Sequence, residues 1–165
     1  MSVSKQEFEN ISKKWLERFL TKNYAREYQI QVLIPESNIS KLAVSAVKKI
    51  DGYSFFEFRP DILGILENGD RTELVFMNRS ISTLSLKEIG ELQCYSRLAK
   101  PKLSFLTSPK GLASEVALLL LNKERQKSLL QYGDNEFITT FKLDPALKVV
   151  EKTSIYPLEM RSVFT

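Results

Sequence analysis

Two apolar stretches joined by a tight turn place the strongest constraint on how this chain folds. Residues 58–65 and 73–80 are rich in branched and aromatic side chains, and Asn68-Gly69 lies between them. Asn-Gly readily adopts the positive φ angles of a two-residue turn, so the pair predicts a β-hairpin with strands near residues 54–66 and 72–79. Because side chains two apart on a strand share a face, the hairpin is expected to gather Asp61, Asn78 and Ser80 at one end of a sheet.

The rest of the sequence contains segments whose apolar residues have helical spacing and segments whose apolar residues have strand spacing. Apolar residues at helical spacing predict helices, whereas alternation and β-branched runs predict strands. The expected helices are residues 5–22, 39–50, 85–100 and 111–131, and the expected further strands are residues 28–34, 103–107, 136–143 and 147–151. The last dozen residues are expected to be irregular. This order predicts one α/β domain over residues 1–165, with a mixed central sheet flanked by helices on both faces.

Composition narrows the classes of protein to which the chain can belong. The longest apolar cluster, residues 116–121, is much shorter than the roughly 18 residues of a membrane span, and the N-terminal residues lack the apolar core of a signal peptide. The single cysteine, Cys94, excludes an internal disulfide and favours a reducing compartment. We therefore expect a cytoplasmic protein with no membrane partner.

The ionisable residues limit the chemistry further. The chain has no histidine, which excludes Ser-His catalysis, and a single cysteine together with no histidine excludes zinc clusters. Its 24 Lys and Arg against 20 Asp and Glu give a net charge of +4, which permits nucleic-acid binding. Basic residues mark one side of the first helix (Lys13, Lys14, Arg18, Lys22) and cluster again at Lys123, Arg125 and Lys127.

The hairpin and its neighbours resemble the restriction-endonuclease-like superfamily, also called PD-(D/E)XK nucleases. In that family a helix precedes a hairpin whose first strand carries Pro-Asp and whose second carries an acid, any residue and a lysine. A polar helix and another strand follow. This chain has Pro60-Asp61 on the first strand and Asn78-Arg79-Ser80 on the second, and Gln93 lies on the next helix with Tyr95. The resemblance covers about residues 5–108 and implies a restriction-endonuclease-like fold that acts on DNA.

The resemblance also implies a site. In the family, two carboxylates hold Mg²⁺, which lowers the pKa of an attacking water, and the lysine orients that water. By this correspondence Asp61, Asn78, Ser80 and Gln93 are the candidate catalytic residues, and Asp61 and Asn78 the candidate metal ligands. Asn78 stands where the acid is expected and Ser80 where the lysine is expected. Glu73 is the alternative second acid if the strand register differs, and Lys87 or Glu91 are candidates to reach back from the following helix.

Two functions follow from this degenerate motif. The first is a nuclease-fold protein that binds DNA, with divergent or absent Mg²⁺-dependent cleavage. The second is an inactive nuclease-fold module that forms a homodimer or docks on another protein, using apolar helices near residues 39–50 and 112–121. A DNA gel shift and a measurement of oligomeric state distinguish them.

Overall fold

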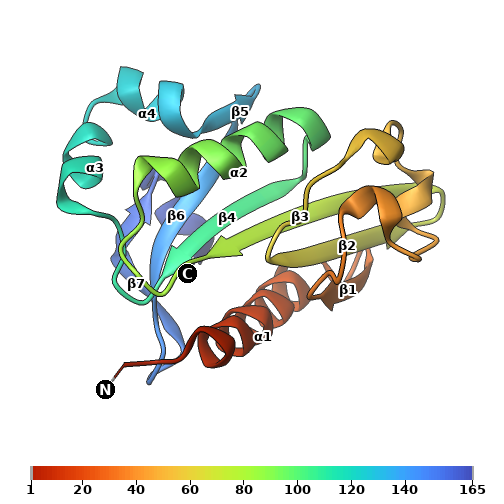
Figure 1. Ribbon diagram of the computed structural model, residues 1–165, viewed down its shortest axis with the longest axis horizontal. Coiled ribbons are helices and arrows are strands. Elements are labelled where there is room, and N and C mark those ends of the chain that lie inside the picture. The colour runs from red at the N-terminus through yellow and green to blue at the C-terminus, as the bar shows by residue number, and fades with distance from the viewer. Residues whose placement is uncertain (1, 165) are drawn as a thin grey trace.

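A mixed sheet of seven strands organises residues 2–164, the part of the chain that this computed structural model describes (Figure 1). Its strands are β1 (Gln29–Leu33), β2 (Ile62–Asn68), β3 (Arg71–Arg79), β4 (Leu103–Ser108), β5 (Gln131–Gly133), β6 (Glu136–Asp144) and β7 (Val149–Tyr156). The spatial order is β1-β2-β3-β4-β6-β5, and β7 also pairs with β6. Strands β1 to β3 form an antiparallel meander, whereas β3, β4 and β6 are parallel. The expected α/β class with a mixed sheet is confirmed.

Helices cover both faces of this sheet. Helix α1 (Lys5–Tyr24) lies on one face, and α2 (Leu86–Ala99) lies on the other with α3 (Ser114–Leu119) and α4 (Lys123–Leu130), as Figure 1 shows. Within residues 2–164, none of these helices has the length and hydrophobicity that crossing a lipid bilayer requires.

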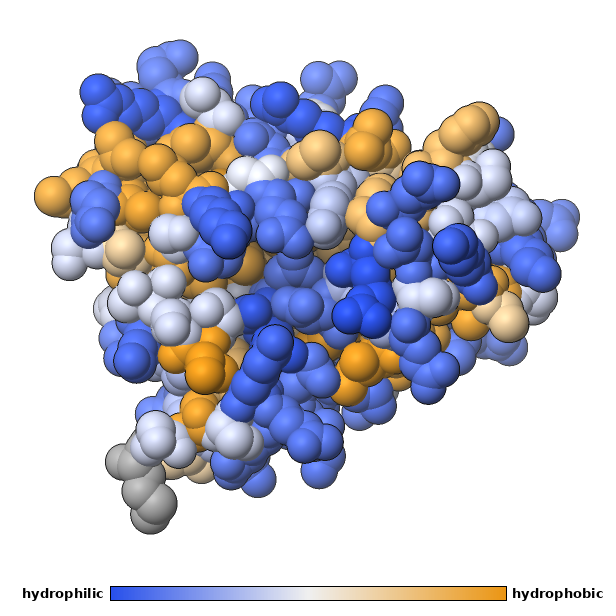
Figure 2. Space-filling model, in the orientation of Figure 1, coloured by the Kyte–Doolittle hydropathy of each residue, from blue (hydrophilic) through white to orange (hydrophobic). Residues whose placement is uncertain are grey.

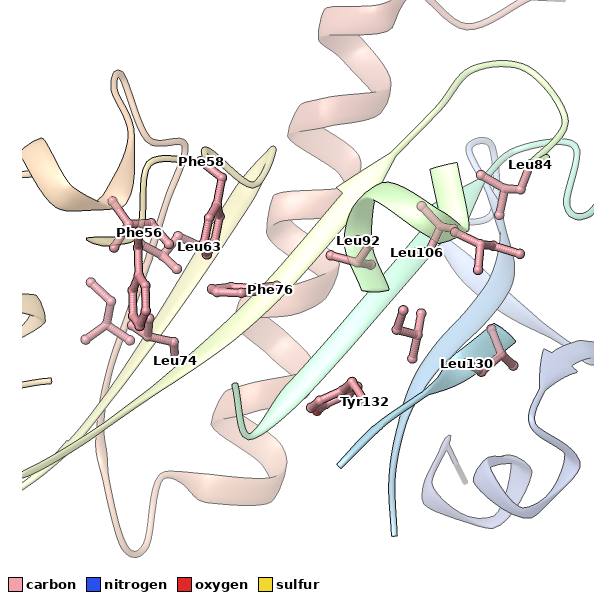
Figure 3. Close-up of a cluster of buried hydrophobic side chains, with 14 of the residues drawn as sticks. Phe56, Phe58, Leu63, Leu74, Phe76, Leu84, Leu92, Leu106, Leu130 and Tyr132 are labelled. Carbon is pink, nitrogen blue, oxygen red and sulfur yellow. The ribbon is translucent and has the colours of Figure 1, made fainter. Parts of the chain in front are cut away.

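Successive side chains of β3 point to opposite faces of the sheet, and each face has its own hydrophobic cluster. Leu74 and Phe76 belong to the cluster on the α2 side, whereas Val75 and Met77 belong to the cluster on the α1 side. Figure 3 shows Phe76 in the first cluster, together with Leu92 of α2 and Leu106 of β4. Because both faces of the central strands are buried, their sequences read as continuous apolar runs.

Local signals in the sequence set the hairpin and the first two long helices. The hairpin turn is present but one residue later than expected: Asn68 still pairs with Arg71, and the two loop residues are Gly69, at a φ of 60°, and Asp70. The side chain of Ser4 caps α1, and Ser85 forms a capping box at the start of α2. The hairpin is therefore confirmed, although its first strand begins at Ile62 and not near residue 54.

The predicted helix over residues 39–50 is wrong. This segment contains only short 3₁₀ turns, at Ile39–Lys41 and Val47–Lys49, and a third turn follows at Tyr53–Phe55. The N–H groups of Ile39 and Ser40 donate to the carbonyl oxygens of Phe58 (3.0 Å) and Phe56 (3.1 Å), so part of the segment pairs with a distant stretch of backbone. Its apolar residues still enter the core, and they satisfy the helical spacing without a helix.

The single long helix predicted over residues 111–131 is also wrong. The helix is interrupted before Asn122. The side-chain oxygen of Asn122 accepts hydrogen bonds from the N–H groups of Glu124 (3.0 Å) and Arg125 (3.1 Å) and so starts α4. The residues after α4 form β5 instead of a helical end. The last residues, expected to be irregular, form a 3₁₀ segment over Leu158–Phe164.

Candidate functional site

The ends of β2 and β3 bring Asp61, Asn78 and Ser80 into one pocket of about 350 Å³. This is the convergence expected from the two-residue period of the hairpin. Its other lining residues are Lys5, Arg79, Ile81, Glu88, Glu91 and Leu106. Glu91 of α2 thus reaches the site from the following helix, and Glu88 of the same helix does so as well.

Asp61 and Asn78 hold the two strands together by a reciprocal pair of hydrogen bonds. The N–H of Asp61 donates to Oδ1 of Asn78 (2.9 Å), and the N–H of Arg79 donates to Oδ2 of Asp61 (2.9 Å). The last regular pair of β2 and β3 is Ile62 with Met77, so Asp61 and Asn78 are the first residues beyond the ladder. The two polar side chains therefore continue the pairing past the end of the ladder, where backbone groups would otherwise need water.

The carboxyl group of Asp61 ionises less readily than an exposed aspartate. Burial raises its pKa, and the negative charges of Glu9 and Glu91 raise it further. The hydrogen bond from the Arg79 N–H and the positive charge of Arg79 lower the pKa without cancelling the effect of burial. The net effect of these groups is a raised pKa for Asp61.

Arg79 turns its side chain to the α1 side of the sheet, as strand alternation predicts. Its guanidinium forms an ion pair with Glu9 of α1, and the Arg79 side chain is only 7% exposed. Its Nε atom is buried without a hydrogen-bond partner among residues 2–164. Alternation along β3 gives the face on which Arg79 lies, but only the packing of α1 identifies Glu9 as its partner.

Two acids of α2 complete the pocket, and each is already hydrogen-bonded. Glu88 accepts the N–H of Ser85 (2.8 Å) in the capping box. Burial raises the pKa of Glu88, but the hydrogen bonds from Ser85 outweigh burial and hold that pKa below its usual value. Glu91 accepts the hydroxyl of Tyr95 (2.9 Å), and burial together with this hydrogen bond raises the pKa of Tyr95 to about 12.

Glu73 lies at the opposite end of the hairpin. It accepts the hydroxyl of Tyr28 (2.7 Å) and forms ion pairs with Arg71 (2.9 Å) and Lys102 (3.4 Å). Asn78 is five steps further along β3, about 16.5 Å at 3.3 Å per residue. The alternative register that would make Glu73 a second acid beside Asp61 is therefore wrong.

Gln93 is also outside the pocket. Its Nε2 donates to the carbonyl oxygens of Ser128 (3.0 Å) and Gln131 (3.1 Å), so it ties α2 to the end of α4 and the start of β5. Lys87 does not line the pocket either. Of the sequence-predicted site residues, the structure thus assembles Asp61, Asn78 and Ser80, adds Glu91, and leaves out Glu73 and Gln93.

The strand residues Asp61 and Asn78 supply one carboxylate and one neutral amide, a weaker donor pair for Mg²⁺ than two carboxylates. Magnesium in proteins is held by carboxylates in near-octahedral geometry. Here one carboxylate oxygen of Asp61 and the carbonyl oxygen of Asn78 already accept backbone N–H groups, and Lys5 brings positive charge to the pocket. Among residues 2–164, no three His, Cys, Asp or Glu side chains are grouped as metal ligands.

Comparison with known proteins adds no family to this description. No protein-family model matches the chain, and no curated protein matches it significantly. Because one fold can host many activities, function is inferred from the pocket and from the distribution of charge.

Proposed function

We propose that this protein binds DNA through a nuclease-like fold and does not hydrolyse phosphodiester bonds at a Mg²⁺ centre. The element order supports the nuclease-like part, because helix α1 precedes the β2–β3 hairpin, and α2 and then β4, which is parallel to β3, follow it. Asp61 and Asn78 stand at the ends of adjacent strands in the pocket, where the resemblance expects the paired acids. Cytoplasmic location remains part of this proposal.

The reciprocal hydrogen bonds between Asp61 and β3 are the main support for the proposal that the protein does not hydrolyse DNA. A catalytic cation must be held strongly enough to lower the pKa of a bound water. In this pocket the expected second carboxylate is the neutral amide of Asn78, which accepts the Asp61 N–H, and the expected lysine is Ser80. Asp61 therefore strengthens the contact between the two strands, and β3 supplies no second carboxylate to pair with it.

The test combines binding and cleavage on the same preparation. We expect the protein to retard duplex DNA in a gel shift at low salt, with affinity that falls as salt rises. We expect no nicking of supercoiled plasmid with either Mg²⁺ or Mn²⁺. Metal-dependent nicking that disappears in Asp61→Ala would contradict the non-hydrolytic proposal, and no DNA retardation at any salt would contradict DNA binding.

Restoring the family pattern gives a second arm to this test. Because β3 directs residues 78 and 80 into the pocket, the double variant Asn78→Glu, Ser80→Lys adds a carboxylate and an ammonium beside Asp61. We expect Mn²⁺ binding, measured by titration calorimetry, in the double variant and none in the natural protein. Equal Mn²⁺ binding by both proteins would show that the natural donor set suffices.

An exposed apolar surface on α3 and the turn that follows it supports an alternative, in which the protein is an interaction or homodimerisation module. Leu118 and Leu121 are 68% and 66% exposed, and Figure 2 shows hydrophobic surface in the region of α3. Exposed apolar patches commonly mark protein interfaces. Light scattering after size-exclusion chromatography tests this alternative: a dimer that Leu118→Ser, Leu121→Ser converts to a monomer, with no DNA retardation, would favour it.

A further inference from the structure

A groove separates α1 from the hairpin formed by β6 and β7, next to the face of the sheet that α1 covers. The guanidinium of Arg18 donates to the carbonyl oxygen of Lys148 (3.3 Å), which places the tip of this hairpin beside α1 (Figure 1). Two hollows of about 450 and 350 Å³ follow the groove, and both are lined by Arg18 and Lys148. The groove is therefore bounded by segments that are 130 residues apart in sequence.

Positive charge dominates this groove. Its lining contains five exposed cations, Lys14, Arg18, Lys22, Lys148 and Lys152, and within the described residues Glu7 is the one acid that lines it. The groove therefore has the same excess of four positive charges as the whole chain, and the rest of the surface is close to balanced.

Four of these cations have no carboxylate partner among the described residues. Lys14, Arg18 and Lys22 are four residues apart on α1, so they follow one side of the helix at about 6 Å per step. Across residues 2–164, Lys14, Arg18, Lys148 and Lys152 take part in no ion pair, whereas the adjacent Lys13 pairs with Glu17 (2.9 Å). Like charges held close together without counter-charges are a usual feature of a surface that binds a polyanion.

The aromatic floor of the groove indicates which form of nucleic acid fits. Single strands are bound by stacking their bases on open aromatic faces. Trp15 lines the groove, but its ring stacks on Phe19 (5.1 Å between centroids) and on Phe164 (5.6 Å), so neighbouring side chains already occupy its faces. Trp15 therefore offers no open face to a base, and the charge of the groove favours contact with the phosphates of a duplex.

We propose that this groove is the surface that contacts the phosphate backbone of double-stranded DNA, without preference for sequence. This inference rests on the proposed function and assigns it to residues outside the Asp61 pocket. The larger hollow begins at Ser4, and the Asp61 pocket is lined by the next residue, Lys5. A duplex in the groove would thus extend past the start of α1 toward the end of the hairpin.

Two triple variants that remove the same charge test the groove. The groove variant is Lys14→Gln, Arg18→Gln, Lys148→Gln, and the control is Lys123→Gln, Arg125→Gln, Lys127→Gln on α4, across the sheet. Affinity for a short fluorescent duplex of mixed sequence is measured by anisotropy from about 50 to about 200 mM salt. Circular dichroism and thermal unfolding establish that both variants fold as the natural protein does.

We expect the groove variant to lose at least about tenfold in duplex affinity at the lowest salt. The slope of log affinity against log salt should fall by about 2.7, or 0.9 for each of three lost phosphate contacts. The control variant should change affinity by less than about twofold, and the natural protein should bind the duplex more tightly than either of its separated strands.

Other outcomes separate this inference from the proposed function. If the two triple variants lost DNA affinity equally, net charge alone would explain the binding. That result would overturn the assignment of the groove and leave DNA binding intact. Tighter binding of single strands than of the duplex would also overturn the groove assignment. Failure of the natural protein to bind DNA, with or without binding to vesicles of anionic lipid, would overturn both proposals.

Discussion

At the scale of single residues, the buried guanidinium of Arg79 depends on one carboxylate. Glu9→Gln removes the counter-charge but keeps the shape of the side chain, and leaves a cation with a side chain only 7% exposed. Breaking a buried pair from one side is costly, so we expect the free energy of unfolding to fall by about 3 kcal/mol in urea denaturation.

A second pair on the same helix provides the control for Glu9. Glu17→Gln breaks the more exposed pair with Lys13 (2.9 Å), and such i,i+4 pairs contribute only about 0.3–0.5 kcal/mol. Losses of similar size in the two variants would mean that Arg79 finds other partners when Glu9 is changed.

Asp61 should reveal its burial through the pH dependence of stability. Its pKa in the folded protein is raised above the ordinary value of 3.8, so the folded state prefers the protonated form. That preference stabilises the fold below the unfolded pKa and is lost as pH rises through the folded pKa. The stability of Asp61→Asn relative to the natural protein should therefore increase from pH 3 upward and become constant above the folded pKa.

Urea denaturation of both proteins across this pH range checks the prediction. Every other ionisable group is shared, so the difference between the two curves isolates Asp61. A difference that does not vary with pH, or that decreases as pH rises, would contradict a raised pKa.

At the scale of elements, Gly64 lets α1 approach β2 closely. A Cβ atom at Gly64 would lie 2.9 Å from Cδ1 of Leu20 and 3.0 Å from Cβ of Val75. The leucine tip can move, but the Val75 Cβ is fixed to its strand, so we expect Gly64→Ala to cost about 1–3 kcal/mol in urea denaturation. Gly90→Ala is the matched control, because nothing lies within 4 Å of its Cβ position in α2 and alanine favours a helix. Equal effects of the two substitutions would contradict this packing argument.

Elements with strong local signals could be predicted from sequence, and elements decided by distant contacts could not. Gly69 permits the tight hairpin turn, and Ser85 with Glu88 starts α2, through interactions within a few residues. Residues 39–50 have helical spacing, but Ile39 pairs with Phe58 across an intervening loop, which no local pattern encodes. The cap at Asn122 was a local signal that the apolar run before it concealed.

The candidate site divides in the same way. The two-residue period of the strands is sufficient to bring Asp61, Asn78 and Ser80 together, because all three lie near the end of one hairpin. Sequence could not decide between Asn78 and Glu73 as the partner of Asp61, because register depends on where the turn places the strands. The partners of Gln93 and Arg79 come from α4, β5 and α1, and follow only from tertiary packing.

At the scale of the whole molecule, the two ends of the described chain meet on one hydrophobic cluster. Phe164, near the end, stacks on Trp15 of α1 and also contacts Phe105 and Phe141 of the sheet, with ring centroids 5.3–6.0 Å apart. This contact covers the aromatic floor of the basic groove. The last turn therefore contributes both to the core and to the surface that we assign to DNA.

This arrangement predicts that Phe164 is far more important for stability than its position near the chain end suggests. Phe164→Ala removes a half-buried ring from four aromatic contacts, and we expect a loss of about 2 kcal/mol in the free energy of unfolding. Leu158→Ala, in the same 3₁₀ segment but 50% exposed, should cost less than about 0.5 kcal/mol. The variant should also uncover one face of Trp15, so its indole fluorescence should shift to longer wavelength. Unchanged stability and fluorescence would mean that the terminal turn does not cover the core.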